Sequence, residues 1–155
     1  MANGMPISVV GGNRDIMDCG EWFISSTFAG ESASLAAAFK TIVLLQTKYS
    51  VNHLWEKGRN FQEKFNSFSP LKIEGYPTRG AFVGDANLKA LFWQEACKAG
   101  LLFGASFFYC FPHEEVSELV LNLCSDIFTK LKTQGIRLEG AAPKSPFAQQ
   151  LREKT

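Results

Sequence analysis

Residues that carry hydroxyl groups gather in one short segment, directly ahead of an alanine-rich stretch. In order along the chain this segment contains Ser25, Ser26, Thr27, Gly30 and Ser32. Gly30 allows a tight or left-handed backbone, and Ser32 can cap the helix that the alanines favour. Hydroxyl and backbone N–H donors placed before a helix start are suited to holding a phosphate group. The same residues are typical of ordinary turns and helix caps, so the pattern alone leaves both interpretations open.

The elements that must position this loop are predicted from the spacing of apolar residues. Residues 5–10 form a short run between glycines and predict a buried strand, and residues 22–25 predict a second, extended segment. A brief helix is expected between them, over 13–18. From 32 to 48, apolar residues recur at helical spacing among alanines, which predicts a helix that is buried on most of its sides.

Two further helices supply most of the predicted core. The first follows Ser50, and its apolar stripe comprises Leu54, Gly58, Phe61, Phe65 and Phe68. The second begins at Pro112 and ends at Gly135, and its stripe comprises Val116, Leu119, Val120, Leu123, Ile127 and Leu131. Stripes of this kind are far more often core than ligand-binding surfaces, so we interpret both as packing faces.

Short strands are expected between these two helices. They are predicted over 71–74, 78–84, 101–103 and 107–111. A turn at 75–77 joins the first pair, and a helix from Asp85 to Gly100 separates the two pairs. The alternation of strand pairs with helices predicts an α+β fold.

The composition excludes several classes of partner. With 16 Lys and Arg against 15 Asp and Glu, the net charge of +1 gives no electrostatic basis for binding nucleic acid or an anionic membrane. The chain has two histidines and no close cysteine pair, so no metal site is expected. We interpret the four cysteines as reduced, buried thiols. Because no stretch is long enough to span a membrane and the first residues lack signal-peptide features, we expect a cytoplasmic protein.

Two motifs give the chain a resemblance to a known family. Residues 27–38 read TFAGESASLAAA and resemble the T-F-G-G-[EN]-x-L-[SA]-L-A-A-A segment of class III aminotransferases, pyridoxal-phosphate enzymes that include the glutamate-1-semialdehyde aminomutases. Residues 2–17 are similar to the run that follows the Schiff-base lysine in that family. Residues 100–103 and 111–116 match later family segments in outline.

The resemblance implies how the chain is organised. Residues 1–31 would end the large cofactor-binding domain, 32–66 would form linking helices, 67–135 a small C-terminal α+β domain, and 136–155 a loosely ordered tail. The family's lysine would stand just before Met1, so the chain resembles a C-terminal portion of a fold-type I enzyme, with no catalytic residue of its own and not competent alone. Apolar surface is then expected to be exposed at Ile7, Val9, Trp22 and Phe23.

The resemblance also implies a site and its ligands. Ser26 and Thr27 would reach the phosphate of pyridoxal 5'-phosphate held by the second subunit of a homodimer. The substrates would be a small amine and a carbonyl compound, exchanged by amino-group transfer or by an internal amine shift. Glu31 stands where many relatives have asparagine, which suits the branch that acts in amino-sugar and polysaccharide biosynthesis. Asn3 and Gly4 would shape the turn after the lysine.

Two other interpretations remain open from the residues themselves. The chain suits a non-catalytic, stand-alone α+β domain that binds a ligand or serves as a scaffold. Alternatively, Cys110 and His113 suit a nucleophile and its base in a small enzyme, although their three-residue spacing across a proline argues against this. His113 at a helix start is more typical of a cap, and Arg79 at a strand edge is more typical of a surface residue than of a carboxylate ligand.

Overall fold

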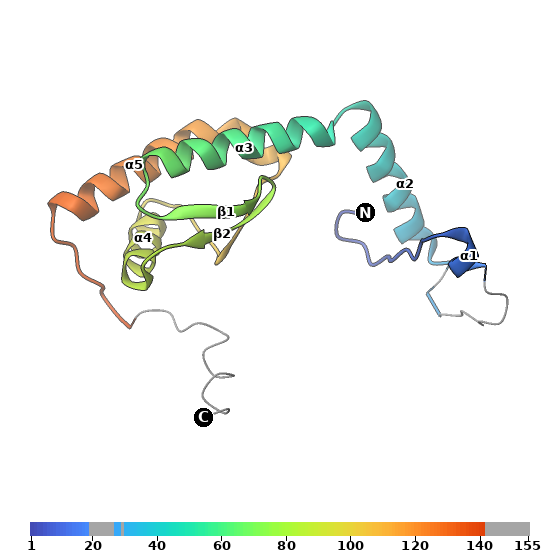
Figure 1. The fold of residues 1–155 in the computed structure, drawn as a ribbon, viewed down its shortest axis with the longest axis horizontal. Coiled ribbons are helices and arrows are strands. Elements are labelled where there is room, and N and C mark those ends of the chain that lie inside the picture. Colours follow the sequence, from blue (N-terminus) through green and yellow to red (C-terminus); the bar gives the residue numbers. More distant parts are fainter. Residues whose placement is uncertain (19–26, 29, 142–155) are drawn as a thin grey trace, which may run out of the picture. The chain divides into compact units, whose positions relative to one another are not determined.

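The computed structural model describes residues 1–18, 27–28 and 30–141, and it divides the chain into two compact units, Met1–Val51 and Asn52–Thr155 (Figure 1). Within the described residues the first unit is helical, and the second combines helices with a three-stranded antiparallel sheet. The chain therefore contains a small α+β domain, and the predicted fold class is confirmed. No helix in the described residues is long and apolar enough to cross a membrane.

In its described residues the first unit holds two helices, α1 (Arg14–Met17) and α2 (Ser32–Thr47). Both were expected from the sequence, but the strand predicted over 5–10 was wrong. A strand needs a neighbour to pair with its N–H and C=O groups, and the described part of this unit provides no second strand. Val9 is 67% exposed, as expected, while Ile7 is half-buried. The predicted segment 22–25, with Trp22 and Phe23, lies outside the described residues.

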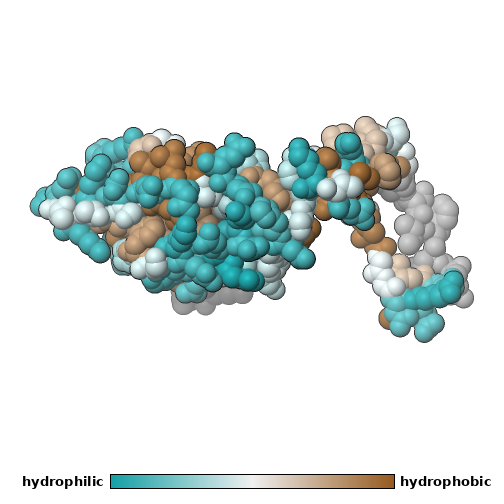
Figure 2. Space-filling view, turned by 90° about the horizontal axis from the view of Figure 1, so that it is seen from above, coloured by the Kyte–Doolittle hydropathy of each residue, from teal (hydrophilic) through white to brown (hydrophobic). Residues whose placement is uncertain are grey.

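Helix α2 is much less buried than its sequence predicted. Only Ser34 and Ala38 are buried, whereas Leu35, Phe39 and Ile42 are 48%, 72% and 43% exposed. Their spacing of four and three residues places them on one face. The alanines allow close packing but do not supply a partner, and these three apolar side chains stay partly or largely exposed. Figure 2 shows apolar side chains reaching the surface of both units.

The second unit begins with α3 (Val51–Phe68), whose aromatic stripe faces the core as predicted. Gly58, Phe61 and Phe65 are buried, and the partly buried Leu54 and Phe68 pack against the same core. The remaining helices are α4 (Ala86–Lys98), the 3-10 helix η1 (Phe111–Val116) and α5 (Ser117–Thr133). Figure 1 shows α3 and α5 on the same side of the sheet.

The sheet has the order β1-β2-β3, with β1 at Lys72–Tyr76, β2 at Arg79–Val83 and β3 at Ser106–Phe108. The β1–β2 hairpin turns at Pro77 and Thr78, two residues later than the predicted turn begins, because Gly75 and Tyr76 still pair with Gly80 and Arg79. The strand predicted over 101–103 was wrong: β3 pairs with Arg79–Ala81 of β2, and Leu102 is 90% exposed.

The buried face of α5 differs from its predicted stripe. Leu121, Cys124, Ile127 and Phe128 are buried, whereas Leu119 is 60% exposed. Of the predicted stripe, Ile127 is buried and Val120 and Leu131 pack against the core, whereas Val116 belongs to η1.

Helix α4 follows its predicted bounds. Asp85 caps its first turn by accepting the N–H of Leu88, and Gly100 follows its last turn with a φ of 82°. The described part of the C-terminal segment is attached to this helix, since Gln94 bonds the Arg137 carbonyl and the Glu139 N–H. Residues 142–155 lie outside the described part of the chain.

Two of the cysteines are not buried as predicted. Cys97 and Cys110 are exposed, Cys124 is buried, and Cys19 lies outside the described residues. Cys97 follows the buried Ala96 by one position, so its side chain turns away from the core.

Candidate functional site

The predicted phosphate-binding loop is described only in part. Ser26 lies outside the described residues. Thr27 lies in a turn and is exposed, next to Phe28, which is 78% exposed. The Glu31 N–H donates to the Phe28 carbonyl and links this turn to the start of α2. The Thr27 hydroxyl is therefore accessible to a ligand from solvent.

Glu31, rather than Ser32 as predicted, caps α2. Its carboxylate accepts the Ala33 N–H at 2.9 Å and the Ser34 N–H at 2.6 Å, and Ser32 is already the first helical residue. The neighbouring Ser34 side chain and the N–H groups of Ser34 and Ala33 lower the pKa of Glu31 below its ordinary value. A carboxylate at the positive end of a helix is held by the same charges that would hold a phosphate.

This cap limits what the loop can offer to a phosphate. Two N–H groups in the first turn of α2 already donate to Glu31, and a phosphate placed there would meet a negative carboxylate. Thr27 precedes this cap by four residues and keeps an exposed hydroxyl. The described residues fit a phosphate through Thr27, and they do not fit one at the α2 N-terminus.

Three other residues named from the sequence have clear structural surroundings. Asn3 and Gly4 have φ angles of 47° and 106°, and the Met5 N–H donates to the Ala2 carbonyl, so the predicted turn is confirmed. Arg79 is exposed, and its guanidinium lies over the Phe108 ring, 5.6 Å from the centroid. That position agrees with a surface residue.

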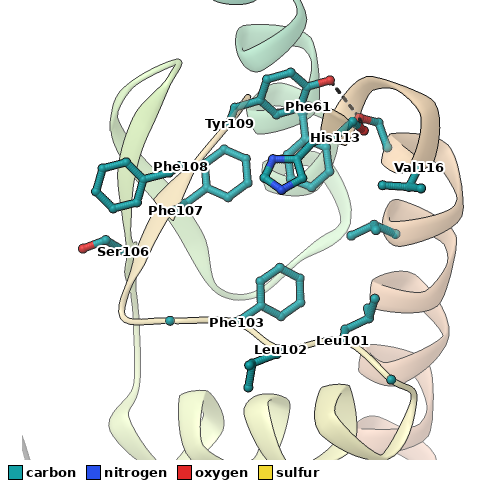
Figure 3. A pocket seen from close by; sticks show the side chains of 14 residues that line it. Phe61, Leu101, Leu102, Phe103, Ser106, Phe107, Phe108, Tyr109, His113 and Val116 are labelled. Carbon is teal, nitrogen blue, oxygen red and sulfur yellow. Dashed lines mark hydrogen bonds between the residues drawn. The ribbon is translucent and has the colours of Figure 1, made fainter. Parts of the chain in front are cut away.

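A cavity of about 370 Å³ lies within the second unit, between β3, α5 and the loop that follows α4 (Figure 3). Its wall is mostly aromatic and aliphatic. The lining residues are Phe61, Gly100, Leu101, Leu102, Phe103, Gly104, Ser106, Phe107, Phe108, Tyr109, His113, Val116, Ser117 and Val120. None of these side chains carries a permanent charge. Small-molecule sites have this size and character, with an apolar wall and a few converging polar groups.

The polar groups of the cavity gather at one end. Figure 3 shows His113 and the Tyr109 hydroxyl at the end opposite Leu101 and Phe103, while the Ser106 hydroxyl points away. Ser117 Oγ donates to the His113 carbonyl at 2.7 Å, which uses its only proton. Tyr109 therefore donates its own proton to Ser117 Oγ, at 2.8 Å. The Tyr109 oxygen is left with acceptor capacity only.

His113 caps the start of η1 and thereby fixes its own tautomer. Its Nδ1 accepts the Cys110 N–H at 3.2 Å, so the proton of the neutral ring lies on Nε2. Cys110 Sγ lies 3.4 Å from Nδ1 and 3.8 Å from Nε2. The three-residue spacing across Pro112 thus allows the Cys110 thiol and the His113 ring to lie close together, which the sequence analysis had not expected. The hydrogen bond between them is nevertheless that of a helix cap, from the Cys110 N–H to His113 Nδ1.

A separate polar cluster links α3 to η1. The Glu114 carboxylate accepts from His53 Nε2 and from Lys57 Nζ, each at 3.0 Å. The hydrogen bond from His53, followed by that from Lys57, lowers the pKa of Glu114, and Glu114 in turn raises the pKa of Lys57. These groups are partly exposed, and we interpret them as a structural contact. Among the described residues, no three His, Cys, Asp or Glu side chains lie together in a way that could hold a metal ion.

The cavity was not predicted from the sequence. Its walls come from α3, the loop at 100–104, β3, η1 and α5, which become neighbours only in the folded unit. The sequence signal nearest to it is the aromatic run at 107–109 beside Gly104, which by itself predicts only a strand.

Comparisons of the chain with protein-family models, with curated proteins and with solved structures found no match. The functional inference therefore rests on the motifs and on the geometry described above.

Proposed function

We propose that the chain is part of a class III pyridoxal-phosphate-dependent aminotransferase or aminomutase, from the C-terminal side of its Schiff-base lysine. The observation that carries this proposal is the pair of motifs at 2–17 and 27–38, which occur in the family's order. The exposed Thr27 hydroxyl and the small α+β unit that follows α2 are compatible with it.

In this proposal, Thr27 donates a hydrogen bond to the cofactor phosphate of a second subunit, and Ser26 contributes a second donor. Bound pyridoxal phosphate supplies an electron sink for moving a proton between carbon centres of the amine substrate. Glu31 fixes the start of α2 and so orients the turn that carries Thr27. The exposed face of α2, with Leu35 and Phe39, would pack against the rest of the complete protein.

The DNA that precedes the codon for Met1 gives the first test. The proposal expects an open reading frame there, with a lysine codon about two codons before that of Met1 and a large domain before it. A stop codon directly upstream of Met1 in every related copy of the gene would contradict it.

The complete enzyme gives the second test. Thr27→Val removes a hydroxyl that donates to a dianion and should raise the dissociation constant for pyridoxal phosphate about tenfold or more. Thr133→Val is the matched control, because the Thr133 hydroxyl bonds only the Thr129 carbonyl within α5. Equal dissociation constants for pyridoxal phosphate in the two variants would show that Thr27 does not bind the cofactor. The isolated chain, mixed with pyridoxal phosphate and borohydride, should form no specific adduct.

A second candidate function is a stand-alone α+β binding domain. The observation that favours it is the cavity, which is built entirely from residues 61–120 of the second unit and needs nothing from the first. The two candidates differ in what they bind: pyridoxal phosphate at Thr27, or a small molecule in the cavity.

A further inference from the structure

We propose that the free edge of β3 pairs with β3 of a second copy of the chain, so that two three-stranded sheets join into one antiparallel sheet of six strands. The argument rests on the backbone of β3, on the opposite edge of the sheet and on the uncharged, apolar surface beside β3. It depends on neither function proposed above.

The backbone of β3 leaves two residues without a hydrogen-bond partner in the described part of the chain. The Tyr109 N–H donates to the Thr78 carbonyl at 3.2 Å, and Phe107, two residues earlier, faces β2 in the same register. Because N–H and C=O groups alternate in direction along a strand, those of Ser106 and Phe108 face away from β2. Among the described residues, no hydrogen bond reaches these groups. An extended strand places donors and acceptors at the matching spacing.

The opposite edge of the sheet is closed by side chains of α3. On β1, the Asn66 side chain accepts the Ile73 N–H at 2.7 Å and donates to the Ile73 carbonyl at 3.0 Å. Gln62 donates to the same carbonyl at 2.7 Å. Natural proteins protect unpaired edges by covering them, or with charged residues, prolines and bulges. The residues of β3, Ser106–Phe108, have none of these devices, so this edge is open to an added strand.

The surface beside β3 favours a second copy of this chain as the source of that strand. A twofold interface brings each patch against itself, so a charged patch would repel its own copy. β3 has no charged residue, and no lysine, arginine, aspartate or glutamate lines the cavity next to it. Leu102, Phe108 and Val116 in this lining are 90%, 56% and 41% exposed, which gives both copies an apolar surface. Because β1 is closed, β3 is the edge that each copy offers.

The two open residues determine the register. With Ser106 opposite Phe108 of the second copy, and the reverse, the open N–H and C=O groups of both strands form four hydrogen bonds. Phe107 then lies opposite Phe107 of the second copy, in the type of pair whose side chains are closest. Figure 3 shows Phe107 turned into the cavity, and Ser106 and Phe108 turned away from it. The two Phe107 rings would therefore meet on the cavity side of the joined sheet.

Sedimentation of the full chain over a range of concentrations tests the association. We expect a reversible dimer with a dissociation constant of about 10–500 μM, because a few neutral hydrogen bonds and a small apolar area must offset the cost of association. Amide hydrogen exchange below and above this concentration tests the contact. The Ser106 and Phe108 amides should exchange about tenfold more slowly in the dimer. The Tyr109 amide, bonded to Thr78, should be protected in both states.

A sample mixed from ¹³C-labelled and unlabelled chain tests the register. The Hα atoms of the two Phe107 residues lie close together in the proposed pair. An NMR experiment that detects only contacts between labelled and unlabelled copies should therefore show a cross-peak between them.

One substitution removes an edge donor without touching the sheet. Ser106→Pro deletes an N–H that faces away from β2. The dimer then loses two of its hydrogen bonds, one from each copy, so its dissociation constant should rise about tenfold or more. Ser106→Ala keeps the N–H and is the matched control, with a change of less than about twofold. Thr27→Val should leave the constant unchanged, which separates this contact from the proposed cofactor site.

Three results would overturn the proposal. The first is a chain that stays monomeric up to about 1 mM, which would leave the β3 edge to a strand of another protein. The second is a dimer in which the Ser106 and Phe108 amides exchange as fast as in the monomer. The third is an unchanged dissociation constant for Ser106→Pro that is folded by thermal melting. If Ser106→Pro does not fold, the exchange and mixed-label measurements on the parent chain decide. None of these results bears on pyridoxal phosphate at Thr27.

Discussion

Gly58 of α3 lies directly against the Pro77 carbonyl in the turn of the β1–β2 hairpin. A Cβ atom at position 58 would lie 2.4 Å from that oxygen and 2.9 Å from the carbonyl carbon. Such distances are far below van der Waals contact, and the atoms they involve belong to the backbone. The helix therefore approaches the hairpin as closely as it does only because residue 58 has no side chain.

This contact predicts the effect of the smallest substitution at Gly58. Gly58→Ala should destabilise the second unit by about 1–3 kcal/mol through overpacking, although alanine is the better helix former by about 1 kcal/mol. Urea unfolding measures the difference. Asn60→Ala, at an exposed position of the same helix, is the control and should change stability by less than about 0.5 kcal/mol. An unchanged midpoint for Gly58→Ala would mean that helix and hairpin are not in this contact.

The sequence predicts the second unit well where local signals are strong. The stripe of α3 has a clear helical period, and Asp85 and Gly100 bound α4 as N-cap and C-terminal residues do. The β1–β2 hairpin follows from its Pro-containing turn between two β-branched and aromatic runs. In each of these elements the local preference and the packing agree, so the prediction succeeds.

The predictions that fail concern features that depend on distant partners. Residues 5–10 look like a strand, but a strand needs a neighbour that the described part of the first unit lacks. The α5 stripe was predicted only in part, since Ile127 is buried as expected but Leu119 is exposed and Phe128 is buried in addition. Leu102 looks like a core residue and is exposed at the cavity. Periodicity reports which residues share a face, and it cannot report what covers that face.

The two candidate sites, Thr27 and the cavity of the second unit, also differ in how far the sequence alone indicates them. Thr27 is proposed from a motif, because a hydroxyl before a glycine and a helix start is a local pattern. The polar end of the cavity joins Tyr109, Ser117 and His113 through a chain of hydrogen bonds. Their proton directions follow from these bonds and not from residue types. Only the structure could therefore indicate which of these groups donates a proton and which accepts one.

Phe65 is among the best-connected rings of the core, so its removal should be costly. It is fully buried, and its ring lies 5.7–6.1 Å from the rings of Phe82, Phe92 and Phe128 on three different elements. Phe65→Ala should destabilise the unit by about 3–5 kcal/mol. Leu119→Ala, at an exposed position on α5, should cost far less. Similar urea midpoints for the two variants would contradict this view of the core.

The cap of α4 should contribute a measurable part of the stability. Asp85 Oδ1 accepts the Leu88 N–H at 2.8 Å and satisfies a donor that has no partner within the helix. Asp85→Ala should destabilise the unit by about 1 kcal/mol, and Asp85→Ser should restore most of the loss. Guanidinium unfolding of the three proteins measures this. Equal stability of the alanine and serine variants would show that the cap is not formed in solution.

Glu114 should make the stability depend on pH in the acidic range. Its pKa is lowered from the ordinary value of 4.5, first by the hydrogen bond from His53 and then by that from Lys57. The contribution of Glu114 is therefore complete above about pH 4.5, and it is lost as the pH falls through the lower pKa of the folded state. Glu114→Gln should remove this part of the acid sensitivity, as thermal unfolding between neutral and acidic pH would show.

The partners of Glu114 provide the control for that measurement. Lys57→Met removes one hydrogen-bond donor and should move the pKa of Glu114 back towards 4.5 in an NMR titration of the carboxylate. Lys89→Met, on α4, should leave the titration of Glu114 unchanged. If both variants titrate as the parent protein does, the contact between α3 and η1 does not form.

The three described cysteines should differ sharply in their reaction with iodoacetamide. Burial raises the pKa of the Cys124 thiol to about 12, so hardly any reactive thiolate exists at about pH 8. Cys97 and Cys110 are exposed and should be alkylated in the folded chain. Peptide mass spectrometry should find Cys124 modified only after denaturant is added, with Cys97 as the internal standard. Alkylation of Cys124 at the rate of Cys97 in native buffer would mean that α5 does not pack against the core as described.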